Sequence, residues 1–268
     1  MTSELPFPPL EMRENVGPTQ TAAFDNPYGE PIFPDLPAEA YRSILDFGCG
    51  CGRLARQLIQ QQPRPASYLG IDLHAGMIEW CQANLAPHAS GFEFRHHDVF
   101  YEAWNPGEGK PATAPFPSGD GSRTLVIAHS VFTHLIQAHA EYYLSEVARV
   151  LADDGVFEAT WFLFDKRGMP MMQEFQNALY INDVDPTNAV IFDRAWLVET
   201  AGKNGLAIAS VLPPKARGFH WRVRMKPGET GFTVADFPED AAPVSSEGIR
   251  AAVAPGLAGD QAETAQTS

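Results

Sequence analysis

The sequence predicts an α/β fold: a Rossmann-like three-layer sandwich around a seven-stranded, mostly parallel sheet whose last strand is antiparallel. Three observations predict it. Apolar stretches of strand length alternate with amphipathic stretches of helix length from residue 41 onward. A glycine run follows the first of these strands, and an acidic residue stands at or just beyond the end of each of the first three. Strands that alternate with helices form parallel sheets with helices on both faces.

The candidate strands are short apolar segments. They cover residues 43–47, 67–72, 92–94, 124–128, 156–164, 207–212 and 220–225. One helix between them is clearly marked, because apolar residues recur at three- and four-residue spacing along a single face. These residues are Tyr143, Leu144, Val147, Ala148 and Leu151.

Changes in composition divide the chain into three parts. Residues 1–40 are rich in proline and aromatic residues, which excludes a long helix and predicts an arm or lid packed on the main body. The body covers residues 41–226, with loop-like inserts at 101–123 and 165–190. Residues 227–268 are rich in Ala, Gly, Glu and Ser, and we expect a disordered tail because they have too little apolar surface to offset the entropy of ordering.

The charge balance bears on the class of partner. The net charge is -14, from 33 acidic and 19 basic residues, so the chain lacks the basic surface of a nucleic-acid-binding protein. No apolar run is long enough to span a bilayer, and the N-terminal residues do not read as a secretory signal. Three cysteines do not make a disulfide framework. A cytoplasmic protein is therefore expected, and nothing in the sequence indicates its oligomeric state.

The glycine run reads ILDFGCGCGRL over residues 44–54 and lies where a strand turns into a helix. Glycines there allow a ligand to approach the backbone, and the helix N-terminus offers unpaired N–H groups. Acids accompany it: Asp46 precedes the first glycine, Asp72 ends the second strand and Asp98 follows the third. An acid at the tip of the second strand can accept both hydroxyls of a ribose. A dinucleotide-dependent oxidoreductase remains an alternative, although its motif is G-x-G-x-x-G, whereas this run is G-x-G-x-G.

The chain resembles the class I S-adenosylmethionine-dependent methyltransferases over about residues 41–225. The resemblance is carried by four motifs in the family's order, namely ILDFGCGCGRL, YLGID, HHDVF and LVIAHSVFTHL…YYLSEVARVLADDGVF. It implies an enzyme that uses S-adenosylmethionine as its cofactor. The ammonium group of that molecule needs a carboxylate partner, where a dinucleotide's pyrophosphate would need a helix N-terminus.

The resemblance also implies a set of cofactor-binding residues. The methionine part would lie against the glycines with Asp46 near its amino group, Asp72 would hold the ribose, and Asp98 would receive the adenine amino group. The full set comprises Asp46, Gly48, Cys49, Gly50, Gly52, Asp72, Leu73, Asp98, Val99 and His129.

Two histidines are candidate catalytic residues. Methyl transfer from a sulfonium is an in-line displacement, and a hydroxyl acceptor must also lose a proton. His129 follows the fourth strand, where the family often has a small or polar residue, and His134 lies five residues on. We hypothesise that His129 is the base, with a packing or capping role as the alternative for each histidine. The arm, with Arg13, Phe24 and Tyr28, and the second insert are expected to wall the acceptor pocket.

The sequence thus predicts methyl transfer to a small molecule or glycan, most simply at a hydroxyl. N-methylation and a non-catalytic S-adenosylmethionine-binding protein remain alternatives. Many relatives have Tyr-Gln-Asp near the last strand, where this chain has Gly-Phe-His at 218–220, which weakens any transfer of substrate identity. A metal site built from Cys49, Cys51, His96 and His97 is not expected, because structural zinc sites use C-x-x-C spacing and no second cysteine pair exists.

Overall fold

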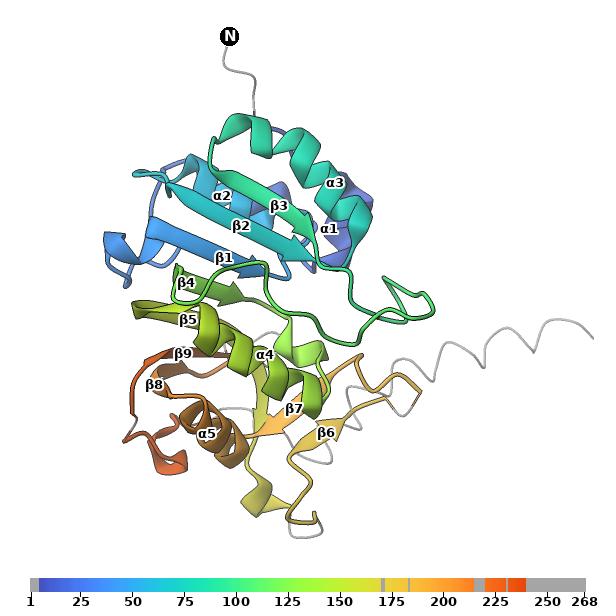
Figure 1. Ribbon diagram of the computed structural model, residues 1–268, viewed down its shortest axis with the longest axis vertical. Coiled ribbons are helices and arrows are strands. Elements are labelled where there is room, and N and C mark those ends of the chain that lie inside the picture. Colours follow the sequence, from blue (N-terminus) through green and yellow to red (C-terminus); the bar gives the residue numbers. More distant parts are fainter. Residues whose placement is uncertain (1–4, 170–171, 183, 215–219, 230, 240–268) are drawn as a thin grey trace, which may run out of the picture.

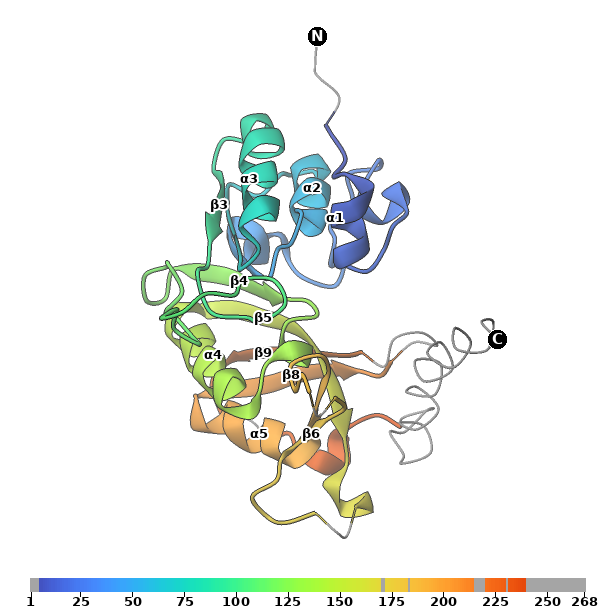
Figure 2. The same ribbon diagram turned by 90° about the vertical axis from the view of Figure 1, so that its right-hand side faces the viewer.

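The computed structural model describes residues 5–169, 172–182, 184–214, 220–229 and 231–239. A twisted sheet runs through the molecule, with helices on both sides (Figures 1 and 2). The described strands are β1 Ser43–Phe47, β2 Ser67–Asp72, β3 Phe92–His96, β4 Arg123–Ala128, β5 Leu151–Phe164, β6 Ala178–Tyr180, β7 Val190–Asp193, β8 Leu206–Leu212 and β9 Trp221–Pro227. The α-helices are α1 Leu10–Asn15, α2 Arg53–Gln60, α3 Ala75–Asn84, α4 Gln137–Val150 and α5 Arg194–Lys203.

The sheet has the predicted parallel core and antiparallel end. Strands β3, β2, β1, β4 and β5 pair in parallel in that order. The long strand β5 then pairs twice: its middle is antiparallel to β9, which pairs with β8, and its last three residues are parallel to β7, which pairs with β6. The predicted fold class is confirmed, and the short strands β6 and β7 add to the seven expected.

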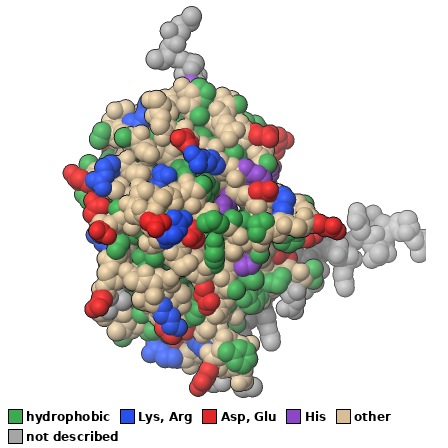
Figure 3. All heavy atoms as spheres, in the orientation of Figure 1, with side chains coloured by type: hydrophobic (Ala, Val, Ile, Leu, Met, Phe, Trp, Pro, Cys, Tyr) green, Lys and Arg blue, Asp and Glu red, His purple; other side chains and the backbone are tan. Residues whose placement is uncertain are grey.

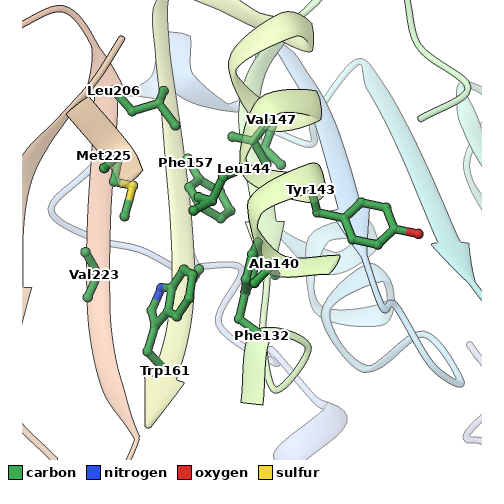
Figure 4. Packing of buried hydrophobic residues seen from close by; sticks show 14 of the residues in the cluster. Phe132, Ala140, Tyr143, Leu144, Val147, Phe157, Trp161, Leu206, Val223 and Met225 are labelled. Atoms are coloured by element: carbon green, nitrogen blue, oxygen red, sulfur yellow. The ribbon is translucent and has the colours of Figure 1, made fainter. Parts of the chain in front are cut away.

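Two hydrophobic cores lie on opposite faces of the sheet because side chains alternate along each strand. On one face, Leu45 and Phe47 of β1 belong to the core that contains residues of α4 and α5. On the other face, Ile44 belongs to the core that contains residues of α2 and α3. Figure 4 shows part of the first core, in which Leu144 of α4 points toward Phe157 of β5. The three-layer arrangement therefore follows from the two-residue period of the strands.

Residues 5–40 pack on the body through one buried arginine. Arg56 of α2 is 3% exposed and donates to the carbonyls of Leu5 (3.0 Å), Pro6 (3.1 Å) and Phe24 (3.0 Å). It also forms an ion pair with Asp25 at 2.6 Å. Carbonyls and a carboxylate together satisfy the buried guanidinium, which therefore holds the arm against α2.

A second set of ion pairs ties the arm to the far end of the sheet. Glu158 of β5 is fully buried and pairs with Arg224 and Arg222 of β9, the latter at 3.0 Å. Arg224 also pairs with Asp35 of the arm. A buried carboxylate needs such partners, since an uncompensated charge in this position is strongly destabilising.

Residues after β9 pack on the body, although the sequence predicted a disordered tail from residue 227. A 3₁₀ helix covers Val234–Asp236, and Phe237 packs edge-on against Trp221 with ring centroids 5.9 Å apart. The body thus includes residues beyond 226. The remainder of the expected tail, residues 240–268, lies outside the described part of the chain.

Candidate functional site

A cavity of about 950 Å³ opens at the carboxyl ends of the parallel strands. It lies beyond the ends of β1 and β4, between which the strand order reverses. In open α/β sheets this switch point is where ligands bind. Ligand pockets usually measure about 300–1,000 Å³, so the volume suffices for a nucleoside-sized cofactor and a second molecule. Figure 3 shows histidine, acidic and hydrophobic side chains close together on one face, beside the protruding loop that follows β3.

The first part of the glycine run, Gly48 to Gly50, lines this cavity, whereas Gly52 does not. Gly48, Gly50 and Gly52 all have positive φ, at 78°, 54° and 78°. A Cβ atom on Gly48 would lie 2.3 Å from Cγ2 of Val131, and one on Gly50 would lie 2.6 Å from Cγ1 of Val16. Both the backbone conformation and the space therefore require glycine. The turn brings β1 into α2 with its backbone exposed to the cavity.

Asp46 lies beneath the turn and is 2% exposed. Its Oδ2 accepts a hydrogen bond from the Tyr68 hydroxyl at 2.7 Å. Burial raises the pKa of Asp46 to about 6, because the charged form is poorly solvated there. A cationic ligand group in the cavity would favour the ionised carboxylate.

The raised pKa predicts a pH-dependent stability. Between the unfolded value of 3.8 and about 6, the folded protein binds the Asp46 proton more tightly than the unfolded chain does. The stabilisation is complete below that window and is lost as the pH rises through about 6. Denaturant titrations should show this fall, by up to about 3 kcal/mol, in the difference between the wild type and Asp46→Asn. Parallel curves for the two proteins across this range would contradict it.

Asp72 supports the turn from the neighbouring strand. Its Oδ2 accepts the Gly50 N–H at 2.8 Å, and its Oδ1 accepts the His74 N–H at the same distance. The N-cap of α3 is the His74 side chain, which accepts from the Met77 N–H, so Asp72 is not the cap itself. Burial raises the pKa of Asp72, and the two backbone bonds oppose that shift. Asp72 and Leu73 both line the cavity.

The structure leaves Asp98 outside the cavity, although Val99 beside it contributes to the lining. The Asp98 carboxylate pairs with Lys110 at 2.8 Å and accepts from the Asn105 amide at 3.0 Å. Its side chain is 57% exposed. Lys110 holds the pKa of Asp98 below its ordinary value. Partners in the following loop thus hold the Asp98 carboxylate, which does not line the cavity, and its contact with adenine stays a prediction.

The three cysteines are buried beneath the turn. Cys81 Sγ lies 3.6 Å from the Gly50 carbonyl oxygen, and Cys51 Sγ lies 3.7 Å from the Met12 carbonyl oxygen. Burial raises the pKa of all three thiols, that of Cys51 to about 11. They pack as protonated thiols, as expected, and only Cys49 lines the cavity. Within the described residues, no group of three or more His, Cys, Asp or Glu side chains is placed to hold a metal ion.

His129 and His134 both line the cavity, but their surroundings differ. Nε2 of His129 is buried and has no hydrogen-bond partner in the described part of the chain, and burial lowers the pKa of this residue to about 3. Nδ1 of His134 lies 2.9 Å from the Thr187 carbonyl oxygen. A carbonyl only accepts, so this hydrogen bond requires the proton on Nδ1 and leaves the lone pair on Nε2.

The arm and the second insert both reach the cavity, through residues other than those expected. Glu14, Asn15, Val16 and Gly17 line it from the arm, and Val184, Asp185, Pro186 and Thr187 line it from the insert. Of the expected residues, Tyr28 is 88% exposed and Phe24 packs in a small core with Cys51 and Met77. Arg13 instead bonds to the Pro8 and Thr19 carbonyls.

Sequence reasoning also missed lining residues whose positions depend on distant segments. His220 at the start of β9 lies 3.3 Å from the Ser130 hydroxyl and packs on Phe162. His220 is the last residue of the Gly-Phe-His segment that replaces the Tyr-Gln-Asp of many relatives. The other two residues of that segment, 218 and 219, lie outside the described residues. Tyr101 joins the two inserts by donating to the Thr187 carbonyl at 3.4 Å. The position of His220 next to a predicted strand could have suggested that it lies near the site. No local sequence pattern predicts that Tyr101 lines the cavity.

Comparisons with known proteins agree with this geometry. Residues 44–155 match the family model described as "Methyltransferase domain". A fatty-acid O-methyltransferase of Mycolicibacterium smegmatis is 31% identical over 140 residues, which cover 52% of this chain and 42% of that protein. An uncharacterized methyltransferase of Emericella nidulans is 39% identical over 49 residues, which cover 18% of this chain and 17% of that protein. The chain thus spans less than half the length of these curated relatives.

Solved structures were also found. One is a TehB-like SAM-dependent methyltransferase from Corynebacterium glutamicum, with 19% identity, a TM-score of 0.49, and coverage of 82% of this chain and 95% of that one. No helix within the described residues is long and apolar enough to cross a membrane. The matched domain includes the glycine turn, Asp46, Asp72 and both candidate histidines. The match confirms the predicted resemblance to methyltransferases over residues 44–155, which make up less than half of the chain.

Proposed function

We propose that the protein transfers a methyl group from S-adenosylmethionine to a hydroxyl group of a small molecule, with a histidine after β4 as the base. One observation carries the proposal: a single cavity is lined by both the glycine turn with its two buried acids and the histidines His129 and His134. A cofactor held at the turn and an acceptor held at the histidines would share that space.

The residues at the turn fit the cofactor. Asp46 is buried with a raised pKa, which suits a carboxylate that meets an ammonium group on binding. Gly48 and Gly50 leave no side chain between the backbone and a ligand. Asp72 holds the turn in this shape and lines the cavity at the end of β2, where an acid can accept ribose hydroxyls.

When bound, S-adenosylmethionine supplies a methyl group on a sulfonium, which an acceptor oxygen displaces in line. The chain must orient the acceptor and take its proton. His129 is expected to remain neutral at pH 7 and to form a hydrogen bond with the acceptor through Nε2, although its pKa of about 3 makes it a weak base. His134 has its Nε2 lone pair set by the bond from Nδ1 to Thr187. We therefore assign proton removal to His134 and orientation of the acceptor to His129, which revises the initial hypothesis.

Substitution of the histidines tests this assignment. His134→Gln is expected to lower kcat by about 100-fold or more, because a general base contributes about 10²–10⁴-fold. His129→Gln should mainly raise KM for the acceptor. Affinity for S-adenosylhomocysteine, measured by calorimetry, should change little in either variant. His88→Gln, outside the cavity lining, is the control. Near-normal kcat in His134→Gln with intact cofactor binding would remove His134 as the base.

The acceptor is tested by a screen that measures release of S-adenosylhomocysteine. Matched hydroxyl, amine and carboxylate compounds should be compared, and small glycans included. Turnover with hydroxyl acceptors alone supports the proposal, whereas preference for amines would make the protein an N-methyltransferase. Cofactor binding without turnover on any acceptor would favour a non-catalytic binding protein.

The name of the Mycolicibacterium relative raises the possibility of a carboxylate acceptor. The lining of this cavity opposes it, since three acids, Glu14, Glu102 and Asp185, line it in addition to Asp46 and Asp72. Among the lining residues that the structure describes, Arg53 is the one Lys or Arg; burial lowers its pKa, and the nearby Asp46 opposes that shift. An anionic acceptor would meet like charge without a compensating partner.

A further inference from the structure

The more exposed part of the cavity contains a cluster of aromatic and acidic side chains that the proposed transfer step does not use. Tyr101 and Trp104 lie in the loop after β3 and stack with ring centroids 5.6 Å apart and planes inclined by 29°. Glu102 lies between them in sequence, and Asp185 comes from the segment between β6 and β7. All four residues line the cavity. We call them the outer cluster.

Hydrogen bonds join the two segments of the outer cluster. The Tyr101 hydroxyl donates to the Thr187 carbonyl at 3.4 Å, and the Thr187 N–H donates to Asp185 Oδ1 at 3.0 Å. Burial raises the pKa of Tyr101, and the nearby Asp185 carboxylate adds to the shift. An aromatic ring and a carboxylate thus lie close together on one wall of the cavity.

The surroundings of the cluster are rich in negative charge. Glu14 of the arm also lines the cavity, while Arg53, another lining residue, interacts electrostatically with Asp46. The nearest lysine in the same loop, Lys110, is not a lining residue and pairs with Asp98. Trp104 is 46% exposed, so its ring is accessible to a ligand.

An independent observation points to a ligand in this cavity. Nε2 of His129 is a buried polar atom that has no partner among the residues described by the structure, and His129 lines the same cavity. Buried polar groups are nearly always satisfied, so an unpaired ring nitrogen beside a cavity indicates a bound group that forms a hydrogen bond with it. A hydroxyl can fill this place whichever ring nitrogen carries the proton, because a hydroxyl both donates and accepts. The outer cluster, by contrast, favours a cation.

We propose that the acceptor carries an ammonium or similar cationic group at the end away from the methylated hydroxyl, and that the outer cluster binds this group. The rings of Tyr101 and Trp104 provide π faces, and Glu102 and Asp185 provide opposite charge. Aromatic faces combined with carboxylates are a favourable environment for an organic cation. The proposal rests on the proposed function, because it assumes that the hydroxyl end of the acceptor lies at the histidines.

Three phenols that differ only at the far end test the proposal. Tyramine carries an ammonium group, para-ethylphenol is neutral, and para-hydroxyphenylpropionate is an anion. Each is titrated by calorimetry into the full chain saturated with S-adenosylhomocysteine, so no turnover occurs. Tyramine is expected to bind roughly tenfold more tightly than para-ethylphenol, and the anion more weakly than both.

Variants assign the preference to the outer cluster. Asp185→Asn keeps an oxygen for the Thr187 bonds and removes only the charge, and Glu102→Gln does the same at its position. Each should reduce the preference for tyramine over para-ethylphenol severalfold, and Trp104→Leu should weaken tyramine more than para-ethylphenol. Glu108→Gln, an exposed acid in the same loop that does not line the cavity, should leave the preference intact.

The outcomes separate the two proposals. If S-adenosylhomocysteine does not bind, the proposed function fails before any phenol is tested. If it binds, the inference is overturned by equal or weaker binding of tyramine relative to para-ethylphenol, by failure of all three phenols at millimolar concentration, or by a preference that survives in both charge variants.

Discussion

Replacing Asp72 by alanine is expected to weaken the binding of S-adenosylmethionine by on the order of 100-fold. The carboxylate accepts two backbone N–H groups, one from Gly50 in the glycine turn and one from His74 before α3. Hydrogen bonds to a charged group contribute about 1.5–3 kcal/mol each. Their loss would free the turn from β2 at the point where we propose that the cofactor lies. Calorimetric titration of both proteins with the cofactor measures the change.

Asp154→Ala is the matched control for Asp72→Ala. Asp154 is an exposed carboxylate whose side chain is 60% accessible and pairs with Arg42 at 3.3 Å on the surface. Exposed pairs of this kind contribute at most about 1 kcal/mol, so cofactor affinity should be unchanged. Circular dichroism establishes that both variants are folded. If Asp72→Ala bound the cofactor within about twofold of the wild type, the proposed role of this acid would be refuted.

Replacing Arg56 by alanine is expected to lower the free energy of unfolding by about 3 kcal/mol and to loosen the arm. The change leaves three backbone carbonyls without the Arg56 donor and leaves Asp25 with Gln60 as its remaining side-chain donor. It also removes the contact between the guanidinium and the Phe7 ring, whose centroid is 3.6 Å away. Because Val16 of the arm lines the cavity, affinity for the cofactor should fall as well. Urea titration and limited proteolysis measure the two effects.

Arg42→Ala is the corresponding control for Arg56→Ala, since Arg42 is 58% exposed in the surface pair with Asp154. Its free energy of unfolding should lie within about 0.5 kcal/mol of the wild type. An Arg56→Ala protein with unchanged stability and unchanged proteolysis of residues 5–25 would show that the arm does not depend on this residue.

The parts of the site that could be predicted from sequence are those set by local rules. The turn with Gly48 and Gly50 was recognisable because glycine follows a buried strand and precedes a helix, and Asp72 because it ends the next strand. Parallel strands bring their carboxyl ends to one edge of the sheet, so these residues had to lie near one another.

The parts that could not be predicted depend on contacts between distant segments. Asp98 also lies close to the end of a strand, but it does not line the cavity. Its carboxylate forms an ion pair with Lys110, twelve residues later in the sequence. The tautomer of His134 depends on the backbone carbonyl of Thr187. Every residue has such a carbonyl, so the sequence does not show which one lies near the histidine. Strand β7, Val190–Asp193, is short and pairs with the last three residues of β5, so periodicity alone could not reveal it.

The central claim is that the cavity at the carboxyl ends of β1, β2 and β4 holds S-adenosylmethionine. The most direct test is calorimetric titration of the protein with S-adenosylmethionine, S-adenosylhomocysteine and NAD in parallel. We predict one molecule of S-adenosylmethionine bound per chain, competition by S-adenosylhomocysteine and no heat of binding from NAD. Binding of NAD without a response to the other two would contradict the claim.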